Sequence, residues 1–79
     1  MYIKDFNQLS LDDKIYLVNN TGSKLIESHS WFGKYDTNLY DVDGIKVNVL
    51  FDKNTKHVMI ARALEDAELK ALTDSYHLN

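Results

Sequence analysis

The stretch Tyr40-Asp41-Val42-Asp43-Gly44-Ile45-Lys46-Val47-Asn48-Val49-Leu50-Phe51 decides the fold. From Ile45 to Phe51 an apolar side chain occupies every other position, which is the pattern of a strand with one buried face. The Asp43-Gly44 pair stands between two such runs and is typical of a type I′ turn, in which both central residues have positive φ. The stretch therefore predicts a β-hairpin with a two-residue loop, in which Val42 pairs with Ile45.

Working outward, the pattern predicts two further strands. The hairpin register sets Asp41 opposite Lys46 on one face and Tyr40 opposite Val47 on the other, which places opposite charges and apolar groups in pairs. The next turn is expected at 52–56 and the next strand at 57–63, with the pairs Phe51–Val58, Val49–Ile60 and Val47–Arg62. An earlier strand at about 25–31 is expected to pair with 35–42 through a turn at 32–34.

Helices are predicted on both sides of these strands. Ser10 can cap a helix whose apolar stripe is Leu11, Ile15 and Val18, and residues 19–22 end it because asparagine and glycine tolerate left-handed backbone angles. A second helix is expected over about 65–76. The prediction is thus one α+β domain over residues 1–79, a four-stranded antiparallel β-meander with one N-terminal and one C-terminal α-helix.

The two faces of the predicted sheet are both largely apolar. The expected core face consists of Val42, Ile45, Val47, Val49, Phe51, Val58 and Ile60. The expected second face carries Leu39, Leu50, Met59, Ala61 and Ala63. Either one helix covers each face, or one face meets a partner. If both helices pack on the core face, we expect self-association through the other face as a symmetric pair.

Composition restricts the class of protein. The chain has 79 residues, a hydrophobic share of 44%, no cysteine and a net charge of −3. It is too small for a second core, and the lack of cysteine excludes disulfides and thiolate metal sites. Neither a signal peptide nor an apolar run long enough to cross a membrane is recognisable. We expect a cytoplasmic protein, without membrane partners, that gains stability by self-association.

A resemblance is carried by residues 40–49 together with Ala61-Arg62-Ala63-Leu64. These residues resemble small uncharacterised bacterial proteins of Bacteroidota type, in which a short helix precedes an antiparallel meander. The resemblance implies the same fold and brings no catalytic residues. In size and charge the chain is also similar to the compact acidic inhibitors of phages and mobile elements.

Residue types capable of catalysis or metal binding do not form a recognisable pattern. The histidines, His29, His57 and His77, have no second ligand at helical spacing. The aspartates Asp36, Asp41 and Asp43 lack the distant glutamate that would close a calcium loop. No serine elbow or phosphate-binding glycine loop occurs. The sequence therefore predicts a protein that is not an enzyme and has no cofactor and no metal.

Aromatic residues suggest a binding surface instead. Trp31, Phe32 and Tyr35 surround a glycine turn, either as core and turn packing or as an exposed anchor, because such rings dominate interface energetics. Arg62, the sole arginine, either lies along the core edge or contacts an anion or a partner. The candidate interaction residues are Trp31, Phe32, Tyr35, Leu39, Leu50, Met59 and Arg62.

Two functions follow from these residues. The first is a non-enzymatic protein-interaction module, homodimeric or an accessory or inhibitory binder of another protein. The alternative is a nucleic-acid-associated accessory factor that uses an aromatic and lysine surface around residues 24–35, with rings stacking on bases. The net negative charge favours the first, because phosphate-binding domains usually carry a basic excess.

Overall fold

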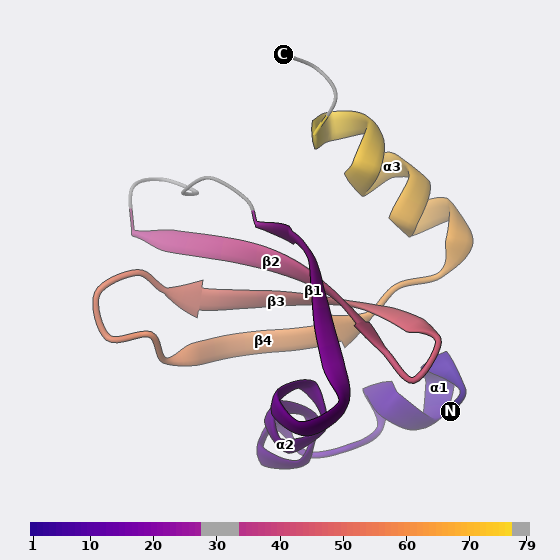
Figure 1. Ribbon diagram of the computed structural model, residues 1–79, viewed down its shortest axis with the longest axis horizontal. Coiled ribbons are helices and arrows are strands. Elements are labelled where there is room, and N and C mark those ends of the chain that lie inside the picture. The colour runs from indigo at the N-terminus through magenta and orange to yellow at the C-terminus, as the bar shows by residue number, and fades with distance from the viewer. Residues whose placement is uncertain (28–33, 77–79) are drawn as a thin grey trace.

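The computed structural model describes residues 1–27 and 34–76, which form an open antiparallel sheet with helices before and after it (Figure 1). The elements are α1 (Ile3–Asn7), α2 (Leu11–Thr21), β1 (Gly22–Glu27), β2 (Tyr35–Val42), β3 (Ile45–Asp52), β4 (Val58–Ala63) and α3 (Asp66–Tyr76). The four strands lie in the order β1-β2-β3-β4, so the predicted α+β meander is confirmed. The short helix α1 was not predicted.

The central hairpin has the predicted register. Val42 pairs with Ile45, Asp41 with Lys46 and Tyr40 with Val47. Asp43 and Gly44 both have positive φ, at 50° and 87°, as a type I′ turn requires. The Lys46 ammonium group lies 2.8 Å from the Asp41 carboxylate, whose other oxygen accepts a hydrogen bond from the Gly44 amide.

The predicted pairing of β3 with β4 is wrong beyond its first pair. Phe51 pairs with Val58 as expected, but Leu50 then pairs with Ile60, so Met59 is an extra residue in a β-bulge. After the bulge, each remaining side chain of β4 points to the face of the sheet opposite to the one predicted. Ala61 and Ala63 lie opposite Val49 and Val47 in the core, whereas Ile60 and Arg62 point to the other side. Alanine on the core side allows α1 and α2 to approach β4 closely.

The first strand begins earlier than predicted. β1 starts at Gly22, directly after α2, and pairs with β2 from Gly22↔Val42 to Glu27↔Asn38. Its register shifts at Leu25, which is therefore an irregular position on this edge strand. The predicted end of the strand, 28–31, lies outside the described residues.

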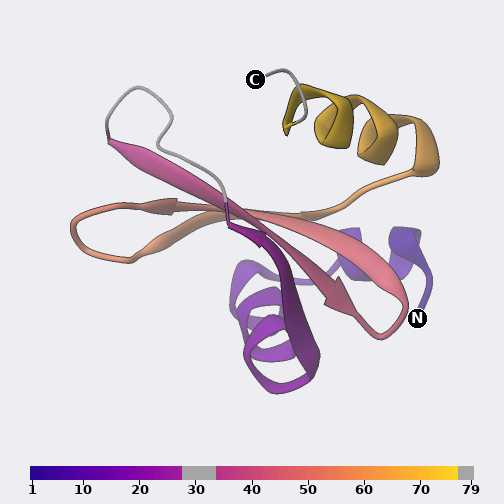
Figure 2. The same cartoon turned by 45° about the horizontal axis from the view of Figure 1, so that its top comes forward.

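The helices lie on opposite sides of the sheet (Figure 2). α1 and α2 cover what we call the inner face, and α3 lies over the outer face. The inner face holds the buried core, which consists of Phe6, Val18, Val42, Val47, Val49, Ala61 and Ala63. Helices on both faces of the sheet were one of the two predicted arrangements. Self-association was predicted for the case in which both helices pack on the core face, and the structure does not have that arrangement.

Helix α1 closes one end of the core and one edge of the sheet. Phe6 is fully buried. The next side chain, Asn7, donates a hydrogen bond to the Ala63 carbonyl at 3.1 Å and accepts one from the Ala63 amide at 2.8 Å. Through these two bonds, the backbone amide and carbonyl of Ala63, which have no neighbouring strand on that side of the edge strand β4, are both hydrogen-bonded. Of the described helices, none is long and apolar enough to cross a membrane.

Candidate functional site

A groove of about 460 Å³ lies on the outer face. We call it the outer-face groove, and it is lined by Tyr35, Thr37, Asn48, Leu50, Ile60, Arg62 and Leu64. Most of the lining comes from the outward positions of three neighbouring strands. Successive side chains of a strand point to opposite faces, so each strand contributes every second residue.

The bulge in β4 completes the groove. Because Met59 is the extra residue, Ile60 stands beside Leu50 on the outer face instead of in the core. Ile60 remains 53% exposed, which leaves a large apolar side chain at the wall of the groove. Leu64 extends the same face past the end of β4, since its amide donates to the Lys46 carbonyl at 2.8 Å.

Helix α3 lies beside the groove without filling it. The Arg62 guanidinium forms an ion pair with the Glu68 carboxylate, which ties the first turn of α3 to β4. Leu69 and Leu72 on this helix are half-buried. The backbone of α3 nevertheless approaches the sheet less closely than the backbones of α1 and α2 do. Figure 1 shows α3 leading away from the strands toward its C-terminal end.

The charged groups at this end of the outer face are paired. A hydrogen bond from Arg62, together with one from the Glu65 amide, lowers the pKa of Glu68 below its ordinary value of 4.5. Hydrogen bonds from Lys46 and the Gly44 amide likewise lower the pKa of Asp41. Arg62 and Lys46 thus each have a carboxylate partner at this end of the outer face.

The lowered pKa of Glu68 predicts a loss of stability in acid. Its ionised form is favoured by the fold, so this contribution is complete above the ordinary pKa of 4.5 and disappears as pH falls through the lower pKa of the folded state. Urea midpoints of the wild type and Glu68→Gln are expected to differ more at pH 6 than at pH 3. An equal difference at both pH values would contradict the role of the ion pair.

The structure brings together only some of the predicted interaction residues. Tyr35, Leu50 and Arg62 all line the outer-face groove. Leu39 lies on the same face but is buried. Met59 is 46% exposed at the bulge and does not line the groove. Trp31 and Phe32 lie outside the described residues.

Sequence reasoning missed several residues of this site. Ile60 was assigned to the core because an unbulged alternation was assumed. Thr37 and Asn48 follow from the alternation of β2 and β3, but their polar side chains gave no reason to include them in an apolar patch. The Asn48 side-chain oxygen is buried and has no hydrogen-bond partner among the described residues.

The described residues that were considered for metal binding form no cluster. In the described part of the chain, no three histidine, cysteine or acidic residues lie close enough to hold a metal ion. His57 is exposed beside a turn, and His29 and His77 lie outside the described residues. Asp41 is bound to Lys46, and Asp43 lies 3.2 Å from the terminal amine of Met1.

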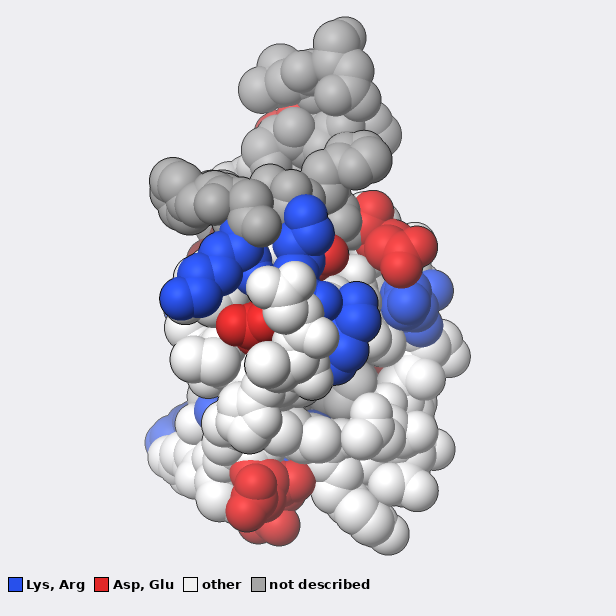
Figure 3. All heavy atoms as spheres, turned by 90° about the vertical axis from the view of Figure 1, so that its left-hand side faces the viewer, with Lys and Arg blue, Asp and Glu red and all other residues white. Residues whose placement is uncertain are grey.

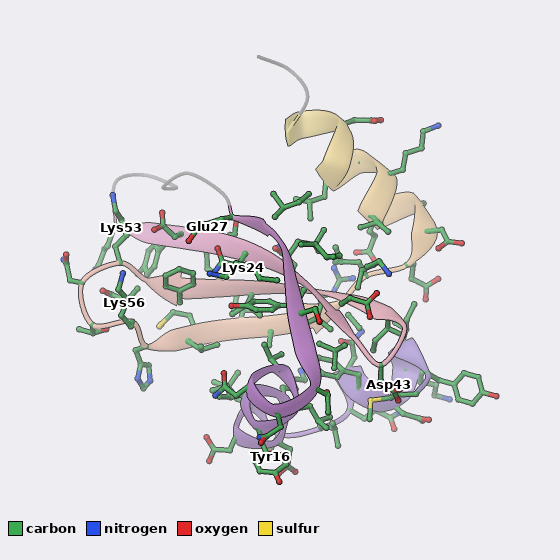
Figure 4. The ribbon with its side chains drawn as sticks, viewed as in Figure 1. Tyr16, Lys24, Glu27, Asp43, Lys53 and Lys56 are labelled. Atoms are coloured by element: carbon green, nitrogen blue, oxygen red, sulfur yellow. The ribbon has the colours of Figure 1, made fainter. Side chains whose placement is uncertain are left out.

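Lysines gather at the other end of the sheet, where β2 begins and β3 turns into β4. Figure 3 looks at this end and shows basic side chains with a few carboxylates among them, and Figure 4 places Lys53 and Lys56 there. Lys34 is adjacent, because its carbonyl accepts a hydrogen bond from the Lys53 amide at 3.0 Å. The Lys34 and Lys56 ammonium groups lie 5.6 and 5.8 Å from the ring centroids of Tyr35 and Phe51.

Comparison with known proteins gives no relative. No family model, no curated protein and no solved structure matches this chain. The resemblance to small bacterial helix-and-meander proteins therefore stays a prediction.

Proposed function

We propose that this domain is a non-enzymatic protein-interaction module that binds through the outer-face groove, and that the groove meets a second copy of the chain. The observation that supports this most directly is the position of Ile60. A half-exposed isoleucine stands in the wall of an apolar groove, so one patch presents both a hollow and a side chain able to enter a hollow.

A two-fold axis makes such a patch self-complementary. In an isologous interface residue i of one copy contacts residue j of the other and the reverse, so each Ile60 can enter the groove of its partner. A standard interface takes about 800 Å² from each partner, roughly a seventh of the 5474 Å² surface of this domain. A domain this small has much to gain from the added burial.

The edges of the sheet are poorer candidates for association. Both edge strands are irregular, β1 at Leu25 and β4 at Met59. Asn7 also occupies the outward backbone groups of Ala63. Bulges and covered edges oppose the addition of a further strand. Association through the face of the sheet therefore fits the structure better than association through an edge.

At the end of the groove where Arg62 lies, charge favours a protein over a nucleic acid. The Arg62 and Lys46 cations are each paired with a carboxylate of the same chain. Binding to phosphates requires cations that can release their counterions on contact. The groove offers apolar surface instead, which suits a protein partner.

The decisive experiment changes Ile60 to lysine. Ile60 is already half-exposed, so Ile60→Lys is expected to fold, whereas in a dimer it would bury an unpaired charge at the centre of the interface. We expect the wild type to sediment as a dimer and Ile60→Lys as a folded monomer at the same concentration. Circular dichroism and a urea titration verify that the variant is folded.

Met59→Lys is the matched control. It makes the same substitution at the neighbouring position, which is 46% exposed and does not line the groove, so we expect it to remain dimeric. A wild type that stays monomeric at millimolar concentration would refute self-association. Tight binding of single-stranded nucleic acid that weakens steeply with salt would instead support the alternative function.

A further inference from the structure

The lysines at the far end of the sheet form a charged patch that the proposed dimer does not use. We call Lys34, Lys53 and Lys56 the basic end. They come from the start of β2 and from the turn between β3 and β4, two segments that the bond from the Lys53 amide to the Lys34 carbonyl holds together. Figure 3 looks onto this end, and Figure 4 labels Lys53 and Lys56 there. In a chain with a net charge of −3, this gathering of positive charge is a local exception.

The basic end is not neutralised by ion pairs within the described part of the chain. None of the ion pairs there includes Lys34, Lys53 or Lys56. The carboxylate of Asp52 belongs to the same turn, but its Oδ1 atom accepts hydrogen bonds from the amides two and three residues further on, at 2.8 and 3.0 Å. The lysine ammonium groups are therefore available to anionic groups from outside the chain.

Lys56 occupies a backbone position that suits glycine better than lysine. Its φ is 63°, in the left-handed region where a side chain is strained and glycine is not. The turn uses only its backbone, because the Lys56 amide donates to the Asp52 carbonyl at 2.8 Å and glycine could donate the same bond. The turn therefore does not explain the lysine, and strained positions of this kind often serve a function of the side chain.

The Lys56 side chain borders a cleft on the inner face, between α2 and the sheet. The cleft has a volume of about 240 Å³, and we call it the inner cleft. Ile15 and Val18 of α2 supply apolar surface on one side, and Phe51 and Val58 supply it on the other. The polar residues of the lining are Asn19, Asn38, Tyr40 and Lys56. An apolar group and an anionic group could thus be bound next to each other.

This combination of cations and apolar surface favours a peptide over a nucleic acid. A phosphate backbone offers charge alone, and the bases of a single strand need open aromatic rings for stacking. At the basic end the Lys34 and Lys56 ammonium groups lie 5.6 and 5.8 Å from the ring centroids of Tyr35 and Phe51, which leaves less ring surface for bases. A peptide can carry a carboxylate and an apolar side chain on adjacent residues, so it can use both features.

We propose that the basic end and the inner cleft together bind an acidic segment of another protein, in which carboxylates stand next to an apolar side chain. The carboxylates pair with Lys53 and Lys56, and the apolar side chain enters the inner cleft between α2 and the sheet. The inner cleft and the outer-face groove lie on opposite faces of the sheet. A dimer formed through the outer-face groove would therefore leave this second surface open.

The test is a fluorescence anisotropy titration with a labelled synthetic peptide, a run of glutamates followed by leucine and phenylalanine. We expect saturable binding to the wild type. Replacing the glutamates by glutamines should weaken binding about tenfold or more, through the loss of several ion pairs. Replacing the two apolar residues by serines should weaken it to a similar degree. No saturable binding, equal binding of either altered peptide, or tighter binding of a single-stranded oligonucleotide would refute the proposal.

Variants of the protein locate the site. Lys56→Gly should be at least as stable as the wild type in urea, because glycine suits the turn, yet bind the peptide about fivefold more weakly. Lys53→Glu should weaken binding about tenfold. Lys4→Glu is the matched control, since it makes the same change of charge on α1, at the opposite end of the sheet, and should leave the affinity within about twofold. Wild-type affinity in Lys56→Gly, or equal losses in Lys53→Glu and Lys4→Glu, would contradict the assignment.

Discussion

Replacing Phe6 by alanine is expected to lower the free energy of unfolding by about 3–5 kcal/mol. Phe6 is fully buried and belongs to the core cluster that includes Val47 and Ala63. Its ring also lies 5.9 Å from the Lys14 ammonium group of α2. A five-residue helix cannot persist in water on its own, so α1 is held by Phe6, by Ile3, which also packs against the core, and by the Asn7 bonds. Truncation would release the helix and open the core.

The effect should be large relative to the whole stability of the domain. Small domains lie toward the lower end of the usual 5–15 kcal/mol, so Phe6→Ala is expected to be partly unfolded without denaturant. Equilibrium unfolding in urea measures the change. Tyr2→Ala is the matched control, because Tyr2 is an aromatic residue of the same segment that is 80% exposed, and its loss should alter stability by less than about 0.5 kcal/mol. A loss below about 1 kcal/mol for Phe6→Ala would mean that α1 does not close the core.

Helix α1 also shows where sequence reasoning ends. Its five residues are too few to show a helical period, and its one buried side chain, Phe6, looks like any isolated aromatic residue. What places it is Asn7, whose partner Ala63 is distant in the sequence. Local patterns carry no information about such a contact. The central hairpin could be predicted for the opposite reason, since Asp43 and Gly44 determine its geometry from adjacent residues.

The candidate site could likewise be predicted only in part. The alternation of β2 and β3 placed Leu50 on the second face, and the structure finds Leu50, Tyr35 and Arg62 in one groove. Ile60 was assigned to the wrong face because residues 57–63 contain no glycine to mark the bulge at Met59. The bulge follows from the packing of Ala61 and Ala63 under the N-terminal helices, which is a tertiary effect. One extra residue thus places an isoleucine that was expected in the core in the wall of the outer-face groove.

Helix α2 ends within residues 19–22 as predicted, but Gly22 does not have the left-handed backbone that was expected there. Its φ of −80° and ψ of 141° are those of an extended strand. The Gly22 amide still donates to the Val18 carbonyl as the last bond of α2, while the same residue pairs with Val42 as the first of β1. The helix therefore passes into the strand without a loop. A side chain at this position would collide with the Val18 carbonyl oxygen, which explains the need for glycine.

Gly22→Ala is accordingly expected to lower the free energy of unfolding by about 2–3 kcal/mol, the cost of forcing an extra carbon into a packed site. The obstacle is backbone, so no rotamer change can relieve it, and either the last turn of α2 or the Gly22–Val42 pair must shift. Gly44→Ala makes the same chemical change where the new carbon meets nothing within 4 Å and only the positive φ of 87° opposes it. It should cost about 1 kcal/mol. Urea midpoints of the two variants test whether Gly22→Ala is the more destabilising change. A Gly22→Ala protein as stable as Gly44→Ala would show that the junction between α2 and β1 can shift at little cost in free energy.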